Sequence, residues 1–95
     1  MKNTNAFKLI EGSFSPDEAR EILMNIFSSK IQFNQMKNFS SEERFGKEDT
    51  TAVKRIPQLK KSMDMISKLI EEAKQNNETI QIISEVKITL SKSKK

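Results

Sequence analysis

Two long stretches of this sequence space their mostly apolar positions alternately three and four residues apart, and a short polar segment separates the two stretches. The positions in the first stretch are Ala19, Ile22, Ile26, Ser29, Phe33, Met36 and Ser40. Leu23, Phe27 and Ile31 form an adjacent row, and the two rows together make one broad apolar stripe. The positions in the second stretch are Ala52, Ile56, Leu59, Met63, Ile66, Ile70 and Ala73. Such spacing gathers each set on one side of an α-helix. Two helices joined by a short turn can bury these sides by packing antiparallel, so the sequence predicts a long helical hairpin. A coiled coil between two chains is the alternative, and the short turn favours the hairpin.

Local signals set the ends of these helices. Ser15-Pro16-Asp17-Glu18 is typical of a helix start, because Ser15 and Glu18 can form a capping box and proline fits the first helical position. The first helix is expected to end at Gly46, with an irregularity near residue 39; a break near Asn38 is the alternative. In the turn 46–50, Asp49 can cap the second helix. Pro57 should either kink that helix or mark its start.

A strand is predicted on each side of the hairpin. Residues Ala6 to Phe14 suit a short strand, and Thr79 to Leu90 alternate apolar and polar residues over an unusual length. The chain therefore predicts an α+β fold with the order β-α-α-β, in which the hairpin packs against a small antiparallel sheet. Residues 1–90 form one domain, and residues 91–95 form a disordered basic tail.

The last strand predicts self-association. A two-stranded sheet is marginal in water, and its long aliphatic strand has a free edge. A second copy can complete a four-stranded sheet across a two-fold axis, which makes a homodimer the expected state. The alternative is a monomer whose last strand folds back on the helices. The residues expected to face one way in the dimer strand are Ile80, Ile82, Val86, Ile88 and Leu90.

Composition excludes several classes of function. The chain has no Cys and no His, which removes disulfides, thiolate and imidazole metal sites and the commonest general base, so no catalytic, metal or cofactor residue is assigned. With only two glycines there is no phosphate-binding loop. The chain lacks an apolar run of membrane-spanning length and a signal-peptide pattern. These features predict a cytoplasmic, non-enzymatic protein without membrane contact.

Positive charge is concentrated in residues 51–95, although the whole chain carries only +4. A basic surface can bind nucleic acid without sequence specificity, but Asp64, Glu71 and Glu72 interrupt it, so a solvated helix surface is the favoured interpretation. The candidate polyanion contacts are Lys54, Arg55, Lys60, Lys61, Lys92, Lys94 and Lys95. Amides at Gln32, Asn34, Gln35 and Asn38 are interpreted as surface, with a small polar ligand or a partner's backbone as the alternative.

The runs SFSPDEAREIL, KIQFNQMKNFSSEERFG and KRIPQLKKS resemble a small uncharacterised bacterial protein family of about this length. The resemblance implies a stand-alone protein without enzymatic activity, and it transfers no functional residue. The leading hypothesis is an interaction module that dimerises through its last strand and presents the hairpin to a partner protein. Weak nucleic-acid binding by the second helix and the basic tail is the alternative.

Overall fold

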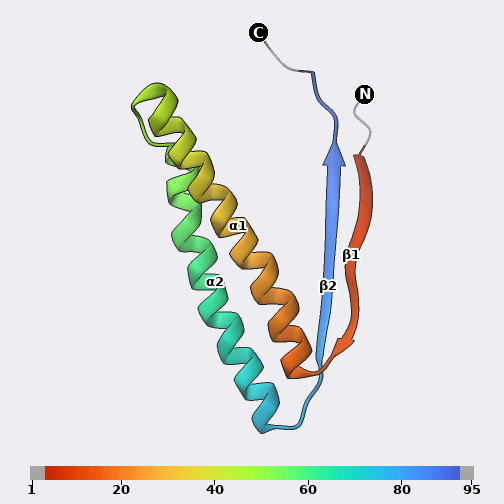
Figure 1. Ribbon diagram of the computed structural model, residues 1–95. Helices are drawn as coiled ribbons and strands as arrows, with labels where there is room; N and C mark the ends of the chain where they lie inside the picture. The colour runs from red at the N-terminus through yellow and green to blue at the C-terminus, as the bar shows by residue number, and fades with distance from the viewer. Residues whose placement is uncertain (1–3, 93–95) are drawn as a thin grey trace.

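The computed structural model describes residues 4–92 and has the predicted α+β fold with the order β-α-α-β (Figure 1). Strand β1 spans Thr4–Phe14 and helix α1 spans Pro16–Phe45. Helix α2 spans Thr50–Gln75 and strand β2 spans Ile80–Thr89. The two helices form an antiparallel hairpin, and the two strands pair antiparallel beside it.

Helix α1 begins and ends where its local signals predict. The Ser15 Oγ accepts a hydrogen bond from the Glu18 N–H at 3.1 Å, and the Glu18 Oε1 accepts one from the Ser15 N–H at 2.9 Å, which completes the capping box. At the other end Gly46 adopts a left-handed conformation with φ 66°, and its N–H donates to the Glu42 carbonyl. The helix is unbroken between these caps, so the expected irregularity near residue 39 and the alternative break near Asn38 are both wrong.

Helix α2 begins before Pro57. The Asp49 carboxylate accepts a hydrogen bond from the Ala52 N–H at 3.0 Å and caps the helix, so Pro57 lies in the helix interior and does not mark its start. Past the C-terminal end, Asn77 has a φ of 54°. This left-handed residue lets the Glu78 N–H donate to the Ala73 carbonyl at 2.8 Å and turns the chain toward β2.

The sheet is longer at its N-terminal strand than expected. Strand β1 starts at Thr4, two residues before the predicted Ala6, because β2 is long enough to pair with it there and Thr4 faces Thr89. The hydroxyl oxygens of these two threonines are 2.7 Å apart. A bulge between Lys8 and Ile10 leaves Leu9 without a partner in the register. Strand β2 lies within one residue of its prediction at each end.

The molecule has the shape of a V. Hairpin and sheet meet at the end that holds Ser15 and Ile80, here called the hinge end, and they diverge toward the Gly46 turn (Figure 1). The radius of gyration is 17.1 Å, whereas a compact domain of this length has about 12 Å. The core is correspondingly small. Its buried hydrophobic members within residues 4–92 are Ala19, Ala52, Leu59, Ile70, Ala73 and Ile82.

The helices pack through one side of α1 only. Arg20 bonds Glu71 of α2 at 3.0 Å, and Asn38 bonds the backbone before α2, so these two residues mark the side that faces α2. Phe27 and Ile31 lie on the same side by helical spacing, since they follow Arg20 by seven and eleven residues. Only part of the predicted broad stripe therefore packs against α2. The row of Leu23, Phe27 and Ile31 faces α2, whereas the longer row lies on another side of α1.

Candidate interaction surface

An apolar stripe on α1 faces away from α2. Its members follow one another by three or four residues, lie more than a quarter turn from the side that contacts α2, and are Ile22, Ile26, Ser29, Phe33 and Met36. We call this set the α1 stripe. Near the hinge end Ile22 and Ile26 are half-buried, beside the buried Ala19. Farther along, Phe33 and Met36 are each 59% exposed. The stripe thus begins in the core and continues into solvent.

The sheet carries a matching apolar face. Pairing places Phe14 opposite Ile80, Phe7 opposite Val86 and Ile10 opposite Ser84, and all of these lie on the same face as Ile82. We call the set Phe7, Ile10, Phe14, Ile80, Ile82, Val86 and Ile88 the apolar sheet face. Ile82 is buried where the sheet meets the helices, but Ile88 is 47% exposed and Phe7 is 56% exposed. Leu90, which the alternation also assigned to this face, lies just beyond β2 and is exposed.

Strand β2 also has a free backbone edge. In the described part of the chain the sheet has two strands, so β2 pairs with β1 along one edge only. Figure 1 shows β2 between β1 and α1, which directs its other edge toward the space between the sheet and α1. We call this space the opening. The α1 stripe and the apolar sheet face both begin at the hinge end, beside the buried Ala19 and Ile82.

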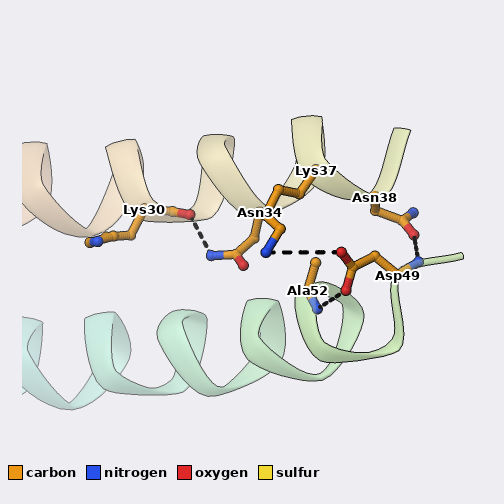
Figure 2. Close-up of polar contacts among 6 residues, drawn as sticks. All are labelled: Lys30, Asn34, Lys37, Asn38, Asp49 and Ala52. Atoms are coloured by element: carbon orange, nitrogen blue, oxygen red, sulfur yellow. Dashed lines mark hydrogen bonds and ion pairs between the residues drawn. The ribbon is translucent and has the colours of Figure 1, made fainter. Parts of the chain in front are cut away.

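Two of the predicted amide residues have structural roles that the sequence did not reveal (Figure 2). The Asn38 side-chain oxygen accepts a hydrogen bond from the Asp49 N–H at 2.8 Å, and the Asn34 amide donates to the Lys30 carbonyl at 2.8 Å. The ammonium of Lys37 lies 4.0 Å from the Asp49 carboxylate. Asn38 thus fixes the turn that Asp49 uses to cap α2. Its position eleven residues before Asp49 gave no local signal of this contact.

The other two amides, Gln32 and Gln35, lie in a shallow groove between the helices. Ile31 and Met63 form its apolar floor, and Lys60 and Asp64 add charged groups. Gln32 and Gln35 are exposed. Within residues 4–92 no buried side-chain nitrogen or oxygen lacks a hydrogen-bond partner, so no unsatisfied polar atom marks this groove as a ligand site.

The candidate polyanion contacts do not form a single patch. Lys54 and Lys61 each follow a buried residue of α2 by two positions, which places them on the side of α2 opposite α1. Lys60 lines the groove between the helices together with Asp64, and Arg55 donates to Gln58 at 3.1 Å. Lys92 is exposed beyond β2. Lys94 and Lys95, with most of the predicted basic tail, lie outside the described residues.

Acidic side chains do not gather into a metal site: in the part of the chain that the structure describes, no three of them lie close enough together to hold an ion. The carboxylates of Asp17, Glu71 and Glu11 instead form exposed ion pairs with Lys74, Arg20 and Lys8. Neither described helix combines the length and the apolar character needed to cross a membrane.

The family resemblance stays a hypothesis, because the comparisons neither support nor contradict it. No protein-family model matches the chain, and no curated protein or solved structure is similar enough to count as a match.

Proposed function

We propose that this chain is a non-enzymatic interaction protein that dimerises through β2 and presents its helical hairpin to a partner protein. In the dimer, β2 of each copy pairs antiparallel with β2 of the other, and the two sheets become one sheet of four strands. The observation that carries the proposal is that β2 combines a free edge with an exposed apolar face along the same strand.

Strand geometry explains why this combination favours pairing. Among residues 4–92, the ten residues of β2 have strand partners along one edge only, which leaves a row of N–H and C=O groups unpaired on the other edge. Natural proteins usually shorten, charge or cover such an edge. Here the apolar side chains of Val86 and Ile88 stand next to that edge, and exposed Phe7 adjoins Val86 on the same face. Pairing between two copies satisfies the backbone groups and removes apolar surface from water together.

Two isoleucines on opposite faces of β2 provide the test. Ile88 lies on the apolar sheet face, and Ile83 lies on the other face, where it is 74% exposed and sits opposite Glu11. Light scattering should give about twice the chain mass of 11.0 kDa for the unmodified protein. We expect Ile88→Lys to produce monomers, because the dimer would have to desolvate an ammonium group. Ile83→Lys should leave the dimer intact.

Since both residues are exposed in the single chain, either substitution is compatible with a folded protomer, and circular dichroism checks this. An unmodified protein that stays monomeric across micromolar concentrations would refute the dimer. Equal behaviour of the two variants would show that the apolar sheet face has no part in it.

Polyanion binding is the second candidate function, and one placement favours it. Lys54, Lys61 and Lys68 are exposed and seven residues apart, so they form a basic row along the side of α2 that faces away from α1. Nonspecific nucleic-acid binding would depend steeply on salt. A titration of the full chain with random-sequence DNA and RNA tests it, and no affinity at low salt rejects this function.

A further inference from the structure

The accessible surface of the chain is larger than that of an average folded monomer of its mass. The accessible surface is 7,999 Å², whereas a folded monomer of 11.0 kDa exposes about 5,600 Å². The difference is about 2,400 Å² per chain, or about 4,800 Å² for two chains, and obligate homodimers bury about 2,000–5,000 Å² in total. The excess surface of two chains therefore falls within the range of areas that obligate homodimers bury.

Edge pairing of β2 leaves part of this surface uncovered. It hides backbone groups of the strand, but Phe33 and Met36 belong to a different element, on the other side of the opening. Both the α1 stripe and the apolar sheet face continue outward from buried residues, Ala19 and Ile82 respectively. Because the α1 stripe and the apolar sheet face begin at the same core and then diverge, a further layer of secondary structure could pack between them.

We propose that this layer is the sheet of the second copy. Each copy inserts its sheet into the opening of the other, so that the α1 stripe of one protomer covers the apolar sheet face of its partner. This inference rests on the proposed dimer and adds which surfaces meet in it. A two-fold axis makes the contact reciprocal, so both stripes and both sheet faces are covered at once.

The lengths of the elements agree with this arrangement. Ser29 lies 13 residues after the start of α1, which is about 20 Å along the helix. The middle of the ten-residue β2 lies about 15–17 Å from its start. Antiparallel pairing centred on β2 therefore places the middle of the partner's strand, around Ser84, at the level of Ser29.

Cross-linking can test this contact because the chain contains no cysteine. We would prepare Ser29→Cys and Ser84→Cys as single variants with different affinity tags, refold them together and add a short bismaleimide cross-linker. Each chain carries one thiol, so every cross-linked product joins two chains. Ser28→Cys is the matched control, since Ser28 is also an exposed serine but lies about 100° around the helix from Ser29.

The inference predicts a mixed product from Ser29→Cys with Ser84→Cys, and little from Ser28→Cys with Ser84→Cys. Equal yields from Ser28→Cys and Ser29→Cys, or no mixed product from a protein that light scattering shows to be dimeric, would overturn the inference and leave the dimer standing. Cross-linking of Ser29→Cys to itself would also overturn it, because the two α1 helices would then meet each other. A monomeric protein would overturn both proposals.

A pair of phenylalanines on α1 gives a second measurement. Phe33 is 59% exposed and belongs to the α1 stripe, while Phe39 is 58% exposed and lies about a third of a turn away. We expect Phe33→Lys to weaken dimerisation by on the order of tenfold or more, since the new charge would be desolvated against the partner. Phe39→Lys should leave the dissociation constant within about twofold of the unmodified value. A loss of affinity equal in both variants, or in neither, contradicts the inference.

Discussion

At the scale of single residues, the hydroxyl of Ser15 makes a contribution that can be isolated. Its oxygen satisfies the Glu18 N–H at the start of α1, and the Glu18 carboxylate returns a bond to the Ser15 N–H. Replacing a serine cap by alanine usually costs about 1 kcal/mol. We therefore expect Ser15→Ala to lower the free energy of unfolding by that amount, measured by urea denaturation at one protein concentration.

Ser13→Ala is the control for this prediction. Ser13 is also exposed, lies two residues earlier in β1 and faces Gln81 across the sheet. Its replacement should change the free energy of unfolding by less than about 0.5 kcal/mol. Equal losses for the two variants would mean that the capping box contributes nothing specific to the stability of α1.

The contacts of individual residues also explain which predictions the sequence supports. Ser15, Gly46 and Asp49 act within four residues along the chain, so the helix ends can be predicted from local patterns. Which side of α1 faces α2 is different, because both apolar rows satisfy the helical period. Long-range contacts indicate the choice: Arg20 bonds Glu71 and Asn38 bonds Asp49. Periodicity contains no information about such pairs, so it places both rows in one stripe without indicating which row contacts α2.

At the scale of elements, helix α2 contains a proline that marks neither the beginning nor the end of the helix. Asp49 caps the helix eight residues before Pro57, so the proline ring occupies an interior turn and removes the N–H that would bond the Val53 carbonyl. An interior proline costs about 3 kcal/mol relative to alanine. We expect Pro57→Ala to raise the free energy of unfolding by roughly 1–3 kcal/mol, because the side chain is exposed and little packing is lost.

Gln58→Ala serves as the comparison, since Gln58 is exposed and accepts only a surface hydrogen bond from Arg55. Its effect should be near zero. A loss of stability in Pro57→Ala would mean that the proline stabilises a shape of α2 on which the fold depends.

The pairing of the strands shows how one element determines another. The alternation in β2 is clear in the sequence, and its ends were predicted within one residue. The start of β1 was not, because Thr4 and Asn5 have no apolar pattern and join the strand by pairing with Thr89 and Ile88. Long β2 therefore extends β1. A second copy of β2 along the other edge would satisfy that edge in the same way.

At the scale of the whole molecule, the extents of 53 × 36 × 15 Å describe a thin body in which few residues lie far from water. Ile70 is the one large side chain within residues 4–92 that is almost fully inaccessible. A core of this size gives little hydrophobic stabilisation to a single chain, and about 25 cal/mol is gained for each Å² of apolar surface removed from water. We therefore expect most of the stability of the folded chain to come from association.

Association makes stability depend on protein concentration, which a monomer does not show. For a folded dimer that dissociates into unfolded chains, a hundredfold increase in concentration favours the folded state by about 2.7 kcal/mol per dimer. The urea concentration at the midpoint of unfolding should therefore be higher at about 100 µM protein than at about 1 µM. Ile88→Lys should show a lower midpoint with a much weaker dependence, while Ile83→Lys should follow the unmodified protein. A midpoint independent of concentration would mean that the monomer is stable alone, and that its exposed apolar faces bind something other than a second copy.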